Sequence, residues 1–78
     1  MSDFLKVDLK KMSWQDAKLV LNTNRDLRMD IAANMQIYGG SFVKDLADCI
    51  YSADTNNTRK LINAFYKYFL QYQPKDWK

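Results

Sequence analysis

Acidic side chains stand at spacings that could support metal binding or acid–base chemistry if they lie on helices. Asp26 and Asp30 are four residues apart, and Asp45 and Asp48 are three apart, so each pair would share one helix face and could hold a divalent cation. Calcium and magnesium sites need several converging oxygen ligands, usually from one loop of fixed spacing, and the sequence contains no such loop. We therefore predict that these aspartates lie on solvated helix faces, with no metal site and no catalytic acid pair.

The nucleophilic side chains lack a base to activate them, because the chain contains no histidine. Cys49 precedes Ile50 in an apolar stripe, which favours a small core residue over a reactive thiol. Ser13 and Ser41 occupy positions typical of helix caps. The glycine pair at 39–40 is not followed by Lys and Ser or Thr, so a phosphate-binding loop is not predicted. The sequence therefore predicts no enzyme activity, no catalytic residue and no cofactor.

The composition is typical of one small globular domain. The chain has 78 residues, of which 47% are hydrophobic and 27% are charged, with two Gly and one Pro. These values argue against disorder and against a turn-rich β architecture. The formal net charge of +3 is compatible with an acidic partner and does not require one.

The same totals bear on the compartment in which the protein works. A single cysteine cannot form an intrachain disulfide, which favours a reducing cytosol. No apolar run approaches the roughly 20 residues needed to cross a bilayer. The first residues also lack the apolar segment of a secretion signal. We therefore expect a soluble cytoplasmic protein that does not bind a membrane.

The strongest helical pattern lies between residues 55 and 72, and the other segments are expected to fold onto it. Asp54 and Thr55 stand ahead of its apolar stripe with side-chain oxygens suited to capping a helix, and Pro74 follows where a helix cannot continue. The apolar residues recur at helical spacing and would lie on one side of this helix. They are Leu61, Ile62, Phe65, Tyr66, Phe69 and Tyr72.

A second helical pattern covers residues 13–38. Ser13 followed by Asp16 resembles a capping box, and Trp14, Ala17, Val20 and Leu21 form the expected buried face. The apolar phase continues through Leu27, Ile31, Met35 and Tyr38, across the polar triplet at 22–24. We predict one long helix, with a break near 22–24 as the alternative. The glycines at 39–40 would end it in a left-handed conformation.

A third pattern covers residues 41–52, where Phe42, Val43, Leu46, Ala47 and Ile50 form an apolar stripe. The short connections at 39–40 and 53–54 would fold each helix back beside its neighbour. The predicted fold is therefore a small all-α three-helix bundle, forming one domain over 1–78. Residues 1–12 would form a loosely ordered arm whose apolar residues dock on the bundle, and residues 73–78 would form a polar tail. The docking residues would be Phe4, Leu5 and Leu9.

From Ser41 to Phe69 the chain resembles a pattern found in small helical proteins encoded by bacteriophages and prophages. The pattern has a Gly-Gly or Tyr-Gly hinge, an Ala- and Leu-rich helix, an Ala-Asp dipeptide, and then Asn, Lys-Leu and Ala-Phe at fixed offsets. In this chain these features are Tyr38 with Gly39 and Gly40, Ala53 with Asp54, Asn57, Lys60 with Leu61, and Ala64 with Phe65. A Pro often follows the Ala-Phe pair, but Tyr66 stands there in this chain, so the helix is expected to continue unbroken. The resemblance implies a viral or prophage origin and a helical fold, and it implies no activity.

Aromatic residues are crowded near the end of the chain. They are Phe65, Tyr66, Tyr68, Phe69, Tyr72 and Trp77. They could pack on the arm and on Trp14 as a half-buried edge, or they could form a protein-binding face, since Tyr, Trp and Arg commonly anchor interfaces. We predict a small helical interaction module that binds a host or phage protein or a second copy of itself. The predicted contact residues are Arg59, Tyr66, Lys67, Tyr72 and Trp77.

Nucleic-acid binding is the alternative function. In a helix-turn-helix the helix at 41–52 would enter the major groove, but its one Lys and two Asp are the wrong charge balance for approaching phosphates. A basic patch with Tyr68, Tyr72 or Trp77 stacking on bases is a better arrangement, and it requires the arm to pack near the last helix. Its cations would come from Arg25, Arg28, Arg59, Lys60, Lys67, Lys6, Lys10 and Lys11.

Overall fold

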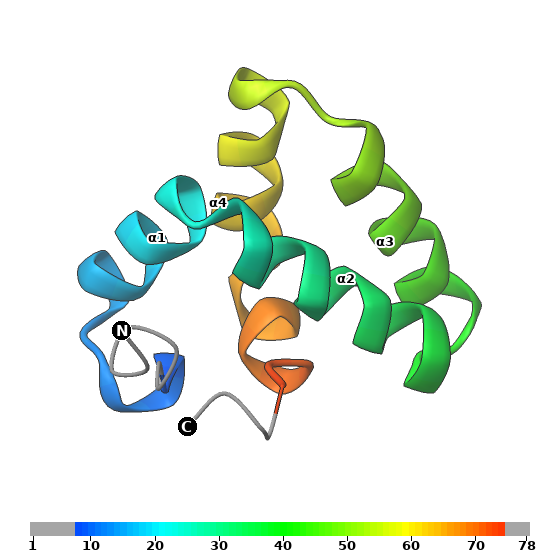
Figure 1. The fold of residues 1–78 in the computed structure, drawn as a ribbon, viewed down its shortest axis with the longest axis horizontal. Helices are drawn as coiled ribbons and strands as arrows, with labels where there is room; N and C mark the ends of the chain where they lie inside the picture. The colour runs from blue at the N-terminus through cyan, green and yellow to red at the C-terminus, as the bar shows by residue number, and fades with distance from the viewer. Residues whose placement is uncertain (1–7, 75–78) are drawn as a thin grey trace.

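The computed structural model describes residues 8–74, and this part of the chain folds into helices joined by short turns. A 3-10 turn, η2 (Leu9–Lys11), precedes four α-helices, which are α1 (Trp14–Thr23), α2 (Arg25–Tyr38), α3 (Ser41–Ser52) and α4 (Thr55–Gln71) (Figure 1). The all-α prediction is confirmed. The predicted three-helix bundle has too few helices, because the segment at 13–38 forms two helices and not one.

The four helices pack as two pairs around one core. α2 packs most extensively on α3, and α1 packs on α4, while smaller contacts join α1 to α2 and α3 to α4. In Figure 1, α1 and α3 lie on opposite sides of α2 and α4, and η2 lies below α1. The turn at 39–40 folds α3 back beside α2, as the short connection predicted. The turn at 53–54 does not do the same for α4, because α4 packs more extensively on α1 than on α3.

The break between α1 and α2 lies at Asn24, whose backbone is extended. The Asn24 N–H donates to the Val20 carbonyl at 2.8 Å and closes α1, while its side-chain oxygen accepts from the Leu27 N–H at 3.0 Å and begins α2. One residue therefore serves as the last cap of one helix and the first cap of the next. The continuous apolar phase did not reveal this break, because a single extended residue changes the helix direction while leaving the core side chains on the same side.

Arg28 completes this corner from the first turn of α2. Its guanidinium donates to the carbonyl oxygens of Leu21 at 2.8 Å and Asn22 at 3.0 Å. These carbonyls belong to the last turn of α1 and have no partner within the helix. Burial lowers the pKa of Arg28 from its ordinary value, and repulsion from Arg25 lowers it further. The corner therefore uses Arg28 as a structural donor.

Gly39 and Gly40 connect α2 to α3 without the predicted left-handed conformation, since both have negative φ. A Cβ atom on Gly39 would lie 2.4 Å from Cγ1 of Val43 and 2.5 Å from the Met35 carbonyl oxygen. A Cβ atom on Gly40 would meet nothing within 4 Å. Gly39 is therefore required by the close approach of α3 to the end of α2, and the cap of α3 is Gly40 where we had predicted Ser41.

α4 begins as predicted and is bent in its second half. The Asp54 side chain accepts from the Asn57 N–H at 2.8 Å and caps the helix. Phe65 has non-helical angles, with φ −121° and ψ 30°, so the prediction of an unbroken helix is wrong. The bend coincides with the packing of the Phe65 ring on Phe42 and Tyr68. Such ring pairs contribute about 0.5–1.5 kcal/mol each, which helps to offset the interrupted helix geometry.

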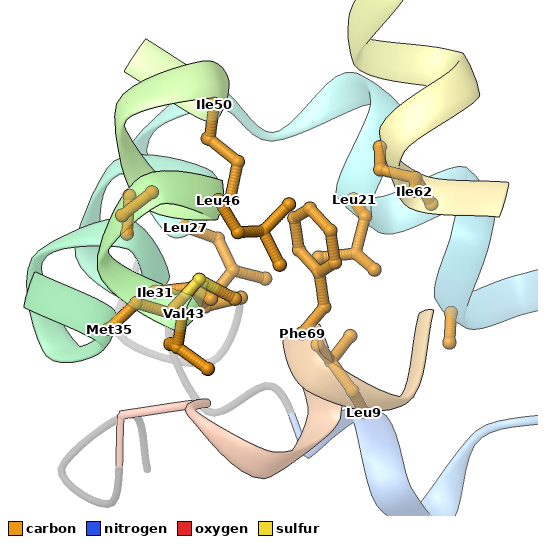
Figure 2. Close-up of a cluster of buried hydrophobic side chains, with 13 residues drawn as sticks. Leu9, Leu21, Leu27, Ile31, Met35, Val43, Leu46, Ile50, Ile62 and Phe69 are labelled. Carbon is orange, nitrogen blue, oxygen red and sulfur yellow. The ribbon is translucent and has the colours of Figure 1, made fainter. Parts of the chain in front are cut away.

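The core is centred on Phe69, which Figure 2 shows among Leu46, Leu21 and Leu9. The buried apolar residues come from η2 and all four α-helices. They are Leu9, Ala17, Leu21, Leu27, Ile31, Ala32, Met35, Val43, Leu46, Ala47, Ile50, Ile62 and Phe69. Docking of Leu9 is therefore confirmed, while Phe4 and Leu5 lie outside the described residues.

Several side chains that we predicted to be buried are exposed. Trp14, Tyr38 and Phe42 lie in the first or last turn of their helices, and more than half of each side chain is exposed. Cys49 is also exposed, so the prediction of a core cysteine is wrong. Its neighbour Ile50 is buried, and successive residues of an α-helix are separated by about 100° around the axis, which turns the thiol away from the core.

The two ends of the described chain are bonded to each other and to α2. The Gln73 side chain accepts from the Leu9 N–H and donates to the Asp8 carboxylate at 3.1 Å. The amide of Asn34 donates to the Tyr72 carbonyl at 3.0 Å. The Gln73 hydrogen bond holds the pKa of Asp8 below its ordinary value, and the backbone N–H of residue 10 acts in the same direction. The beginning of the predicted tail is therefore part of the folded domain.

Candidate functional site

An open groove of about 320 Å³ lies between the first turn of α1 and the middle of α4. We call it the aromatic groove. It is lined by Trp14, Asn63, Ala64, Phe65, Tyr66, Lys67 and Tyr68. Four of its seven lining residues are aromatic, and one is a cation. The groove therefore combines apolar surface with a polar edge, as binding sites commonly do.

Trp14 forms the α1 side of the groove. Ser13 caps α1 by accepting a hydrogen bond from the Asp16 N–H at 3.2 Å, which places Trp14 at the first helical position. The indole is 56% exposed, and the Nζ of Lys18 lies 3.5 Å from the centre of its ring. This cation–π contact spans one helical turn and orients the indole.

The α4 side of the groove is formed by the residues around the bend. Phe65 and Tyr68 are half-buried, and their ring centres are 6.2 Å apart. Phe42 of α3 joins them, with its ring centre 5.7 Å from Phe65 and 5.6 Å from Tyr68. All three pairs are tilted, a favourable arrangement for aromatic rings. The aromatic surface thus continues from the groove to the exposed edge of Phe42.

The charge around the groove is positive. α4 carries Arg59, Lys60 and Lys67, and it contains no acidic residue between Thr55 and Gln71. Lys67 lines the groove, Lys18 covers one face of Trp14, and none of the lining residues is acidic. A ligand in the groove would therefore meet the ammonium group of Lys67 and no lining carboxylate, with the ammonium group of Lys18 beside Trp14.

The structure places the predicted contact residues in three different situations. Tyr66 and Lys67 line the aromatic groove together. Arg59 is exposed on α4 outside the groove lining, and Tyr72 is a half-buried cap residue at the end of α4. Trp77 lies outside the described residues.

Sequence reasoning did not select several residues that line the groove. Trp14 has the helical spacing to Ala17 and Leu21 that is typical of a buried position, so the sequence predicts that it lies in the core. Phe65 and Tyr68 were recognised as part of an aromatic surplus, but their partner Phe42 comes from another helix. Two signals in the sequence point to this surface: the concentration of rings in α4, which exceeds what one helix face can bury, and the expectation that these rings could pack on Trp14.

Residues 8–74 contain neither a candidate metal site nor a helix that could span a membrane. This part of the chain contains no cluster of three or more His, Cys, Asp or Glu side chains that could hold a metal ion. The predicted acidic pairs are exposed, and the Asp48 carboxylate accepts a hydrogen bond from the Gln36 amide at 2.6 Å. None of the helices between these limits is long and apolar enough to cross a bilayer.

Comparison with known proteins identifies no relative. No protein-family model matches the chain, and neither a curated protein nor a solved structure is significantly similar to it.

Proposed function

We propose that the protein is a small helical interaction module, encoded by a bacteriophage or prophage, that binds a host or phage protein in the cytoplasm without catalysis. The observation that carries this proposal is the aromatic groove, in which an exposed Trp14 lines one open surface with Tyr66 and Lys67. Trp and Tyr are the side chains that most often dominate the binding energy of protein interfaces.

The exposure of Trp14 provides a driving force for association. More than half of this side chain is in contact with water, although the core lies directly beneath the same helix. Covering the exposed part of an indole would contribute on the order of 2–3 kcal/mol of hydrophobic free energy. The half-buried rings of Phe65, Tyr66 and Tyr68 would add complementary surface at little entropic cost, because packing already restricts them.

Nucleic-acid binding is the second candidate, supported by the three cations and absent acids of α4. Two contacts make nucleic-acid binding a less favoured function than protein binding. Lys18 occupies one face of the Trp14 ring, which leaves less aromatic surface for stacking bases. Arg28, one of the predicted phosphate ligands, donates instead to carbonyl oxygens of α1.

The test is affinity capture from bacterial lysate with and without nuclease, using the tagged wild-type protein and two variants. Trp14→Ala removes the exposed side of the groove. Ile37→Ala is the matched control, because Ile37 is 66% exposed on α2 and does not line the groove. Circular dichroism would verify that both variants remain folded.

We expect a stoichiometric protein partner that survives nuclease, is retained by Ile37→Ala and is lost with Trp14→Ala. Recovery that disappears with nuclease would favour nucleic-acid binding. If the Trp14→Ala variant still captures the partner at wild-type levels, the aromatic groove is not the binding site of that partner.

A further inference from the structure

The size of the aromatic groove limits what can occupy it. Its volume of about 320 Å³ lies at the lower end of the range of small-ligand sites, which is about 300–1,000 Å³. It can therefore enclose one or two side chains of a partner, while the segment that carries them lies across the open side of the groove. The groove is open to solvent, so a chain segment can lie across it.

The charge of the groove limits its occupant further. Lys67 lies in the lining, Lys18 lies over Trp14, and no carboxylate of the lining competes for either ammonium group. Asn63 and Lys67 line the groove on either side of the bend at Phe65. Lys60 lies one helical turn before Asn63 and extends this polar edge. Charge complementarity therefore favours an anionic occupant, with apolar side chains for the rings.

We infer that the occupant is a short acidic peptide segment of a partner protein, with an apolar side chain inserted between Trp14 and Tyr66. Carboxylates that flank this side chain would pair with Lys67 and Lys18, and the Asn63 amide is available to the peptide backbone. This inference rests on the proposed function and specifies the chemistry of the partner. A single-stranded nucleic acid is less favoured, since it needs cations along several phosphates and free ring faces for stacking.

The experiment is a selection from a displayed library of random dodecapeptides on the immobilised full chain. The same selection is repeated on Lys67→Glu, which reverses the charge in the groove, and on Trp14→Ala. Lys44→Glu serves as the matched control, because it makes the same charge change on an exposed residue of α3 outside the groove. Affinities of selected peptides are then measured by fluorescence anisotropy, with a fluorescent oligothymidylate as the competing probe.

We expect the wild-type protein to enrich peptides with Asp or Glu beside Leu, Ile, Phe or Trp. Lys67→Glu should weaken the binding of these peptides about tenfold, because a favourable charge pair becomes a repulsive one. Lys44→Glu should leave the affinity within about twofold of the wild type. Selection on Lys67→Glu should lose the preference for acidic peptides, and Trp14→Ala should abolish binding.

Four results would overturn the inference. The selected peptides could depend on Trp14 and yet contain no excess of Asp or Glu. This result would show that the occupant is not acidic, and it would leave the proposed function intact. Displacement of the peptides by oligothymidylate, or a dimer that Trp14→Ala disrupts, would identify a different occupant. Failure to select any peptide whose binding depends on Trp14 would also contradict the inference. The proposed function is tested separately, by affinity capture from lysate.

Discussion

Regular helical geometry is interrupted at Asn24 and at Phe65. The two interruptions differ in the side-chain contacts that compensate for the lost helical geometry. At Asn24, backbone and side-chain donors bond the last carbonyls of α1, and Asn24 itself caps α2. At Phe65, the non-helical residue is aromatic, and its ring packs on Phe42 and Tyr68 beside an open groove. The polar corner is therefore a closed structural joint, whereas the aromatic bend leaves half-buried rings open to solvent in the aromatic groove.

The glycine turn at 39–40 is a third joint, and it depends on the close approach of α3 to the end of α2. A substitution at this turn should give the largest change in stability. We expect Gly39→Ala to lower the free energy of unfolding by about 1–3 kcal/mol, because its Cβ would overlap Val43 and the Met35 carbonyl. Gly40→Ala is the control and should change stability by less than about 1 kcal/mol, since its Cβ meets nothing. Urea unfolding followed by circular dichroism measures both. Equal effects at the two glycines would contradict the close-approach account.

At the polar corner, we expect Arg28→Ala to lower the free energy of unfolding by about 2 kcal/mol, because two carbonyls of α1 lose a charged donor. Arg25→Ala removes a neighbouring exposed cation and should change stability by less than about 0.5 kcal/mol. Thermal unfolding of the two variants at one pH gives the comparison. If Arg25→Ala is as destabilising as Arg28→Ala, the carbonyl contacts do not hold the corner.

A smaller effect is expected at Asn24 itself. Replacement by Ala removes the oxygen that accepts from the Leu27 N–H and should cost about 1 kcal/mol. Asn24→Ser keeps a capping oxygen and should retain most of the stability. Denaturant midpoints of the three proteins measure the difference, and a Ser variant no better than Ala would show that the cap does not stabilise α2.

The smallest effect concerns pH and the contact between Asp8 and Gln73. Because the folded state lowers the pKa of Asp8, this contact stabilises the protein above the ordinary pKa of 3.8 and is lost as pH falls through the lower folded value. Gln73→Ala should therefore reduce the loss of stability that occurs as the pH falls from 3.8 through the lower pKa of the folded state. Thermal midpoints measured from neutral pH into acid would test this, with Gln71→Ala, an exposed neighbour, as control. An unchanged acid slope in Gln73→Ala would contradict the linkage.

The periodicity of the sequence predicts the helices well and their interruptions poorly. The helix at 41–52 and the beginning of the last helix were predicted correctly, because short turns and strong stripes mark them. The break at 22–24 remained an alternative, since one extended residue preserves the apolar phase. The bend at Phe65 carries no Pro or Gly to indicate it.

The candidate site was predicted only in part for a related reason. Tyr66 and Lys67 were selected from the aromatic and basic character of one segment, and they do share the groove. Trp14 and Phe42 reach this surface from other helices, and both have helical spacing to buried residues. Periodicity shows which side of a helix faces inward, but it does not show where along the helix the core ends, so exposed aromatic residues in terminal turns are assigned to the core.

The most direct test of the account is an amide chemical-shift map, recorded while the captured protein partner is added to the isotope-labelled chain. The account predicts that the largest changes lie at Trp14 and across residues 63–68, with the Asn24 corner little affected. Changes centred on the α1–α2 corner or on the exposed end of α2, with the groove unchanged, would contradict the claim that the aromatic bend is the binding surface.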